Sequence, residues 1–306
     1  MDQFSSHPLY KKHSIDSVIS SMWDFYSKKF LVLFIASFVM SLIVQYLSSF
    51  INFSGVNITD PTSMIEKFKE FVWPLVGISA LSFVFSLILH YYIIYNPVDS
   101  ETSIFTACYK WLKYIIPYLI IVILFAFLGS IAMILGFFVI VIGMFFAALY
   151  VGMLYLFVLP ILMVEGPNIG NAISRTFVLA HRNFWPNMGW VAVVGLIYLV
   201  FSFIFSSLVL LPFSGSFMKV LTHPEEISGI LDFTSNPVYI ILSALINALI
   251  FPVFPILAVI LYLNGKAREE DTSVAQPSGD EPQRVRVEDL YAKPLPEENK
   301  DKAESQ

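Results

Sequence analysis

The densest group of side chains that could do chemistry lies in one stretch, EGPNIGNAISRTFVLAHRNFW, which runs from Glu165 to Trp185. This stretch and the segment after the last apolar run supply the candidate cluster Glu165, Arg175, Thr176, His181, Arg182 and Arg268. A carboxylate, guanidinium groups and an imidazole at this spacing could bind an anionic group or pair with one another. We expect Glu165 to pair with Arg175 or with Arg268 while Arg182 meets lipid phosphate, and a ligand site is the alternative.

A second candidate is Asn247, which stands in an apolar run ahead of Pro252 and Pro255. An amide in hydrocarbon needs a hydrogen-bond partner, and each proline removes a backbone donor and frees a carbonyl group. We expect a structural kink here, with an intramembrane binding site at Asn247 as the alternative. His90 lies near the end of another apolar run, and we interpret it as a histidine at the membrane interface rather than a proton relay.

Small polar residues recur within the apolar runs. Examples that share a helical face are Ser79, Ser82 and Ser86, and also Ser202 and Ser206. Close helix packing explains them, and a solute path is the alternative interpretation.

Known enzyme signatures are missing from the sequence. It contains no GxxxxGK[ST], HExxH or GxSxG motif, and its single cysteine, Cys108, excludes an intrachain disulfide and a paired-cysteine zinc site. We therefore expect no enzyme activity, no cofactor and no metal. The net charge of -5 lacks the basic excess of a nucleic-acid-binding protein, so we expect no nucleic-acid partner either.

The elements that must position these residues are membrane-spanning helices. Of the 306 residues, 57% are hydrophobic and only 13% are charged, which no soluble core can accommodate. The sequence predicts an all-α polytopic protein with six spans, at Phe30–Ser49, Val72–Tyr95, two within Tyr114–Val164, Met188–Leu211 and Pro237–Leu263. The turn between the third and fourth spans is expected between Gly129 and Gly143, near Gly136.

The distribution of Lys and Arg predicts the orientation. With six spans, ten basic residues flank the side that holds residues 1–29 and 266–306, and three flank the other side. Both termini are therefore expected in the cytoplasm. We divide the chain into a cytoplasmic N-terminus (1–29), a six-span domain (30–265) and a disordered acidic tail (266–306).

Three amphipathic segments, each expected to be an interfacial helix of about four turns, precede the first, third and fifth spans. Their apolar faces are Ile15, Val18, Ile19, Met22, Phe25 and Tyr26; Ile104, Phe105, Cys108, Trp111 and Leu112; and Ile169, Ala172, Ile173, Phe177, Ala180 and Phe184. The layout suggests three repeats of one interfacial helix plus a two-span hairpin. Short outer helices are also expected, one beginning at Asp60–Pro61 and one over Thr222–Leu231.

The stretch from Glu165 resembles a membrane-domain family that accompanies some glycerophosphoryl diester phosphodiesterases and has uncharacterised bacterial six-span relatives. The shared residues are Glu165, Gly166, Ala172, Arg175, Thr176, Phe177, Asn183, Phe184 and Trp185. Near the last span, Tyr262, Lys266 and Arg268 are similar to the family's ending, although Asn264 replaces an acidic residue there. The resemblance extends to about Glu270. It implies six spans with cytoplasmic ends, and no reaction, because the phosphodiesterase barrel is absent.

The sequence is compatible with two main functions. The leading hypothesis is a non-enzymatic protein of a bacterial inner membrane that organises membrane lipids, or another membrane or cytoplasmic protein, through its interfacial helices and tail. The alternative is a transporter or channel for a neutral or amphipathic solute, suggested by Asn247 and the prolines that follow it. A membrane enzyme ranks third, since it lacks nameable catalytic residues.

Overall fold

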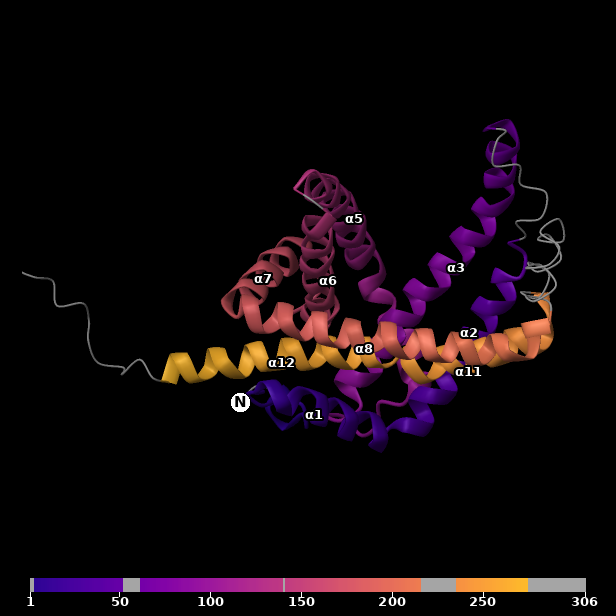
Figure 1. The fold of residues 1–306 in the computed structure, drawn as a ribbon. Coiled ribbons are helices and arrows are strands. Elements are labelled where there is room, and N and C mark those ends of the chain that lie inside the picture. The colour runs from indigo at the N-terminus through magenta and orange to yellow at the C-terminus, as the bar shows by residue number, and fades with distance from the viewer. Residues whose placement is uncertain (1–2, 52–60, 140, 216–234, 275–306) are drawn as a thin grey trace, which may run out of the picture. The chain divides into compact units, whose positions relative to one another are not determined.

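The computed structural model describes residues 3–51, 61–139, 141–215 and 235–274, all helical or in short connections, and no strand occurs within those ranges (Figure 1). The helices are α1 (Ile15–Lys28), α2 (Phe30–Ser48), α3 (Pro61–Tyr95), α4 (Ile104–Lys110), α5 (Ile115–Phe138), α6 (Val141–Val164), α7 (Ile169–Arg182), α8 (Phe184–Leu210), α11 (Pro237–Ile250) and α12 (Val253–Val274), with 3-10 turns η1 (Gln3–Ser6), η2 (Trp111–Tyr114) and η3 (Leu211–Phe213).

Six of these helical segments are long and apolar enough to cross a membrane. They cover Phe30–Ser48, Phe68–Tyr95, Ile104–Phe138, Ile142–Val164, Phe184–Phe213 and Pro237–Asp271. The prediction of an all-α polytopic membrane protein is confirmed. We call the end of the bundle where α3 and α6 end and α8 begins the inner end. The outer end is where α2 ends and α3 and α11 begin.

The predicted outer helix at Pro61 is not a separate element. It is the first part of α3, which continues without a break to Tyr95 and includes Pro74. No glycine or other breaker separates the predicted stripe from the span, so the helix continues. The other predicted outer helix, 222–231, lies outside the described residues.

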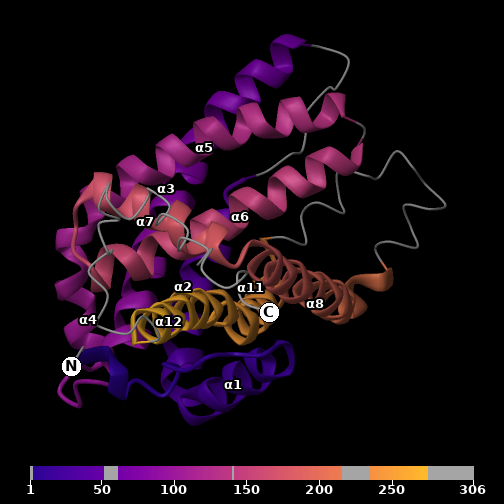
Figure 2. The same ribbon diagram turned by 90° about the vertical axis from the view of Figure 1, so that its left-hand side faces the viewer.

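Helix α5 ends at Phe138 and α6 begins at Val141, so the third and fourth spans separate within the predicted range but after Gly136. Gly136 serves packing instead, because a Cβ atom added there would lie 2.7 Å from the carbonyl oxygen of Gly143. The two glycines let the backbones of α5 and α6 approach closely, as small residues do in membrane helix pairs. Figure 2 shows α5 and α6 side by side.

The last span is interrupted at Phe251 and Pro252, between α11 and α12. This is the kink expected from Pro252 and Pro255, each of which removes one backbone donor. The hydroxyl of Tyr26 in α1 donates a hydrogen bond to the carbonyl oxygen of Leu249 at 2.9 Å. A side chain from the first amphipathic helix thus stabilises the irregular backbone of the last span.

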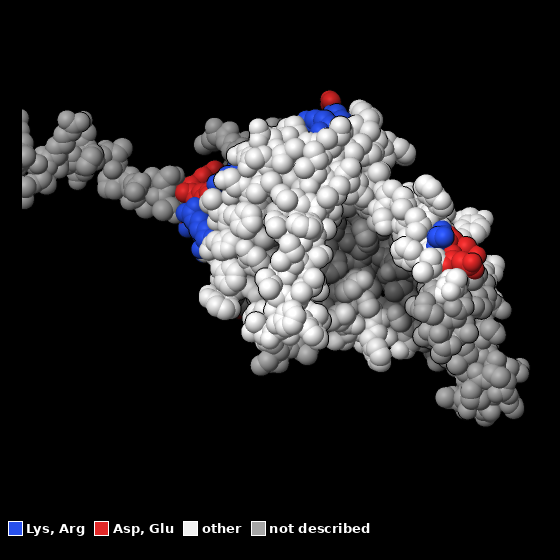
Figure 3. All heavy atoms as spheres, turned by 90° about the horizontal axis from the view of Figure 1, so that it is seen from above, with Lys and Arg blue, Asp and Glu red and all other residues white. Residues whose placement is uncertain are grey.

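The protein core lies at the inner end, where α3, α6 and α12 converge. Side chains there with no exposed surface are Leu87, Leu89, Ile93, Phe157, Ile161, Leu162, Ile256, Ile260 and Tyr262. Towards the outer end the helices expose large apolar side chains instead, which suits contact with lipid chains. The face seen in Figure 3 is hollowed, and Lys, Arg, Asp and Glu colour only a few small patches of it.

The amphipathic helices differ from the prediction in what covers their apolar faces. In α1, Val18, Phe25 and Tyr26 are buried in the core. In α7, Ala172 and Ala180 are buried too. These helices therefore close the inner end of the bundle rather than presenting their whole apolar face to lipid. The second segment is also shorter than expected, because α4 spans seven residues before η2.

The predicted threefold order of one amphipathic helix followed by two spans is present along the chain. The pairing of the spans is unequal, however, because α5 packs on α6 whereas α2 packs most extensively on α11. Buried Ser37 and Ser41 of α2 face an interface to which α11 contributes buried Ala244 and Ala248, so small residues explain this contact.

The chain divides into a body, Met1–Arg268, and a second unit, Glu269–Gln306. Helix α12 continues to Val274, past the predicted start of the disordered tail at residue 266. Gly265 stands just after the predicted span but does not end the helix, and the charged residues that follow, such as Arg268 and Glu270, are good helix formers. The prediction for residues 275–306 concerns a segment outside the described residues.

Candidate functional site

The carboxylate that ends the fourth span is held by Arg175. Nε of Arg175 lies 3.0 Å from Oε2 of Glu165, and one terminal nitrogen donates to Oε1 at 3.3 Å. Gly166, with φ of +108°, turns the chain after Glu165, and Asn168 caps α7 by accepting from the amide of Asn171. This tight connection places Arg175, two turns into α7, directly beside the carboxylate.

Tyr262 of α12 is a third member of this group. Its hydroxyl donates to Oε1 of Glu165 at 3.2 Å, so one carboxylate joins α6, α7 and α12. The side chains of Glu165 and Arg175 are only 15% and 25% exposed. The arrangement links three helices at the inner end and leaves the carboxylate little capacity for an external ligand.

Arg268, the other partner expected for Glu165, makes different contacts. It donates from Nε to Oδ1 of Asn264 at 3.2 Å and from a terminal nitrogen to the carbonyl oxygen of His13 at 3.1 Å. Asn264 also accepts from the backbone amide of His13 at 2.9 Å. Arg182 donates to the carbonyl oxygen of Arg268 at 3.4 Å. Arg175 is therefore the partner of Glu165, and Arg268 binds the N-terminal segment instead.

His181 and Thr176 complete the predicted cluster without forming a ligand site. His181 lies 2.8 Å from the carbonyl oxygen of Phe177 through Nδ1 and 3.2 Å from the hydroxyl of Tyr150 through Nε2, and its ring stacks on Phe184. Thr176 is fully buried, and its hydroxyl has no hydrogen-bond partner within the described residues. The predicted cluster is thus a set of helix-joining contacts.

His90, which we interpret as a histidine at the membrane interface, is buried in the protein near the inner end of α3. Its Nδ1 lies 2.8 Å from the carbonyl oxygen of Ser86 in the preceding turn of α3. Among the residues described, no group of three or more His, Cys, Asp or Glu side chains could hold a metal ion.

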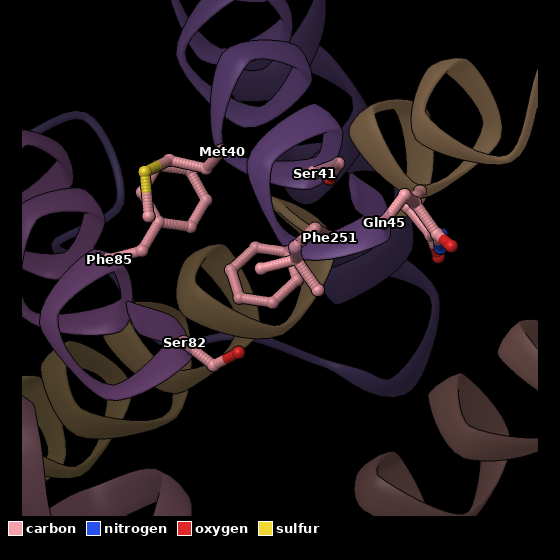
Figure 4. A pocket seen from close by; sticks show the side chains of 8 residues that line it. Met40, Ser41, Gln45, Ser82, Phe85 and Phe251 are labelled. Carbon is pink, nitrogen blue, oxygen red and sulfur yellow. The ribbon is translucent and has the colours of Figure 1, made fainter. Parts of the chain in front are cut away.

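Asn247 lies at a cavity of about 230 Å³ between α2, α3 and α11 (Figure 4). The cavity is lined by Met40, Ser41, Val44, Gln45, Ser82, Phe85, Asn247 and Phe251. The structure thus brings two residues noted in the sequence, Ser82 and Asn247, into one site. Nδ2 of Asn247 donates to the carbonyl oxygen of Ser243 at 2.9 Å, and its Oδ1 accepts no hydrogen bond from the residues that the structure describes.

In α3 and at the end of α11 the aromatic side chains of the cavity lie nearer the inner end than the polar ones, whereas α2 contributes polar and apolar side chains at both levels. Phe85 and Phe251 lie one turn nearer the inner end than Ser82 and Asn247, and their ring centroids are 5.2 Å apart. In Figure 4 Gln45 lies on the opposite side of the view from Phe85. The aromatic pair forms a floor, and beyond it the buried core closes the route to the inner end.

The sequence reasoning missed Ser41 and Gln45. The available signal was a polar stripe at intervals of four in the first span, Ser37, Ser41 and Gln45, which places all three on one helical face. A single serine or glutamine of this kind is common in a packed span. Their significance depends on Asn247, more than 200 residues later in the chain, lying opposite them.

Comparisons of this chain with protein-family models, with curated proteins and with solved structures found no match. Six apolar helices make it an integral membrane protein.

Proposed function

We propose that this membrane protein has a non-enzymatic role in organising anionic phospholipid around its inner end. The supporting observation is the surface formed by α4 and η2, which we call the α4 platform. Phe105, Tyr109 and Leu112 are 80%, 57% and 55% exposed there, and Lys110 and Lys113 are exposed among them. Rings and aliphatic side chains of this kind enter the headgroup boundary, while lysines bind phosphate.

The α4 platform suits this role better than the other amphipathic helices do. The apolar faces of α1 and α7 are largely buried against the protein, whereas the large apolar side chains of the α4 platform are exposed. Nζ of Lys113 lies 4.9 Å from the ring centroid of Tyr114, so its aliphatic stem runs along the protein surface and its ammonium group can reach the phosphate level.

The resemblance noted for Glu165 to Trp185 supports the same proposal, since it implies six spans and no reaction. In this proposal the inner end faces the cytoplasm of a bacterial cell, where anionic lipids attract basic side chains. A protein partner, bound through the interfacial helices or the tail, belongs to the same hypothesis.

The test is native mass spectrometry of the full chain released from nanodiscs that contain phosphatidylglycerol. Each lysine near an anionic surface contributes about 1 kcal/mol, so Lys110→Ala/Lys113→Ala should reduce phosphatidylglycerol retention about thirtyfold. The charge-matched control is Lys11→Ala/Lys69→Ala, because Lys11 lies in the N-terminal segment and Lys69 near the outer end of α3. Equal retention in both double variants would contradict the proposal.

Movement of a neutral or amphipathic solute is the second candidate function, and the cavity at Asn247 favours it. The buried core beneath the cavity would have to open for passage, so a carrier fits better than an open channel. Flux measurements in proteoliposomes with a panel of neutral solutes test this directly. Flux that Asn247→Leu abolishes supports a carrier, and no flux across the panel removes this candidate.

A further inference from the structure

The cavity between α2, α3 and α11 has hydrogen-bonding groups that the described part of the protein does not use. Ser41 is 9% exposed and lines the cavity, yet its hydroxyl has no partner there. The amide of Gln45 and Oδ1 of Asn247 likewise have no partner among the described residues. Gln45 and Asn247 are half-buried, and unpaired amides are costly in hydrocarbon, so these groups favour a polar occupant.

The lining excludes a charged occupant. None of the eight lining residues is ionisable, and an ion or a phosphate group placed there would have no opposite charge beside it in a low-dielectric medium. Amides and hydroxyls supply both donors and acceptors. The chemistry therefore favours a neutral molecule that carries hydroxyl and carbonyl groups together.

The size of the cavity restricts the occupant further. A volume of about 230 Å³ is below that of most pockets for drug-sized ligands and equals the liquid volume of about eight water molecules. It accommodates a headgroup of glycerol size but no acyl chain. A lipid bound there would keep its chains outside the cavity, in the surrounding membrane.

The vertical order of the lining matches a lipid in the outer leaflet. Gln45 and Asn247 lie nearest the outer end, Ser41 and Ser82 lie further in, and Phe85 and Phe251 lie about one turn closer to the inner end than Ser82 and Asn247. A lipid of that leaflet likewise has its headgroup outward and its chains inward. The aromatic floor suits the first carbons of the chains.

We propose that this cavity binds the uncharged glycerol headgroup of a diacylglycerol. Its hydroxyl donates to Oδ1 of Asn247, and its two ester carbonyls accept from the Gln45 amide and from the hydroxyls of Ser41 or Ser82. An amphiphile with a single hydroxyl would leave most of these groups unpaired. The site is independent of the α4 platform, which lies at the inner end and binds charged lipid.

The experiment uses the full chain in nanodiscs that contain both diacylglycerol and phosphatidylglycerol, with native mass spectrometry to count each lipid. We expect one retained diacylglycerol per chain. Gln45→Leu and Asn247→Leu should each lower this retention about tenfold, because each removes a hydrogen-bonding partner of the headgroup. Phosphatidylglycerol retention should not change, which separates this proposal from the proposed function.

Controls address folding, location and the source of the headgroup. Ile43→Leu is the matched control, since Ile43 is an exposed residue of the same helix outside the cavity lining. If either leucine variant fails to fold, Ser82→Ala replaces it, and we expect a smaller loss of diacylglycerol retention. A photoreactive diacylglycerol should label α2 or α11, and excess free glycerol should not displace it. The proposal is overturned if diacylglycerol is retained no better than bulk lipid, or if the folded variants retain it as well as the unmodified protein does. It is also overturned if the cavity holds water alone.

Discussion

The imidazole of His7 is hydrogen-bonded to α3, with Nε2 lying 3.1 Å from the carbonyl oxygen of Ile93, a residue 86 positions later. Nδ1 of the same ring accepts from the backbone amide of Leu9 at 3.1 Å. This pattern requires the neutral tautomer with the proton on Nε2. Protonation of Nδ1 would place its N–H group against the backbone N–H group of Leu9, so the hydrogen bond between them would be lost. Burial also disfavours the charged form of the ring.

The stability of the inner end should therefore fall as the pH falls. Burial lowers the pKa of His7 from 6.5 to about 4, against the smaller opposing effect of the bond to Ile93. Below pH 6.5 the unfolded chain binds a proton that the folded chain does not, so stability present at neutral pH is lost towards pH 4. The loss from His7 is up to about 3 kcal/mol. Thermal unfolding in detergent from pH 7.5 to 4 measures it.

The variant His7→Gln provides the comparison for this pH dependence. It should unfold at a lower temperature at pH 7.5 but lose less stability on acidification. Some slope should remain, because burial also lowers the pKa of His13. His181→Gln is the control at the exposed end of α7. A pH profile of His7→Gln parallel to that of the unmodified protein would contradict this assignment.

A double-mutant cycle should separate the two possible partners of Glu165. The hydrogen-bonded ion pair predicts a coupling of about 1–2 kcal/mol between Glu165→Gln and Arg175→Gln. Arg268 binds Asn264 and the backbone of His13 instead, so Glu165→Gln and Arg268→Gln should be additive. Unfolding free energies of the single and double variants decide this. Coupling with Arg268 equal to that with Arg175 would contradict the observed geometry.

The contact between α5 and α6 should not tolerate a methyl group. Gly136→Ala places its Cβ atom 2.7 Å from a backbone oxygen of Gly143, so we expect destabilisation of about 2 kcal/mol and faster hydrogen exchange in both helices. In the control, Gly195→Ala, the added Cβ atom meets no neighbouring atom within 4 Å. If both variants are equally stable, close backbone approach does not hold this pair together.

The hydrogen bond from Tyr26 to Leu249 should be measurable by removing a single oxygen atom. Tyr26→Phe leaves the ring in place but frees the carbonyl oxygen of Leu249 beside the helix break, which should cost about 1 kcal/mol. Tyr46→Phe is the control, since Tyr46 is an exposed residue of α2. The difference in melting temperature between the two variants tests the link, and no difference would show that α1 does not stabilise the break.

The candidate sites divide according to the range of the contacts that form them. Glu165 and Arg175 are ten residues apart, so a turn at Gly166 and one helix determine their pairing, and the sequence named both. The cavity needs Gln45, Ser82 and Asn247 on three separate helices. Asn247 and Ser82 were visible as polar residues in apolar runs, but nothing local shows which faces meet. The burial of His90 was missed for the same reason.

What the sequence by itself determined is the number of spans, the kink at Pro252 and the positions of the amphipathic helices. These follow from hydrophobic length, missing backbone donors and helical periodicity, all of which act over a few turns. Only the tertiary structure decided that α2 packs on α11, that α1 covers the core instead of lipid, and that the N-terminal segment binds α3 through His7. In a membrane every span is apolar all round, so pattern alone cannot select partners, and small residues and scattered hydrogen bonds make that choice.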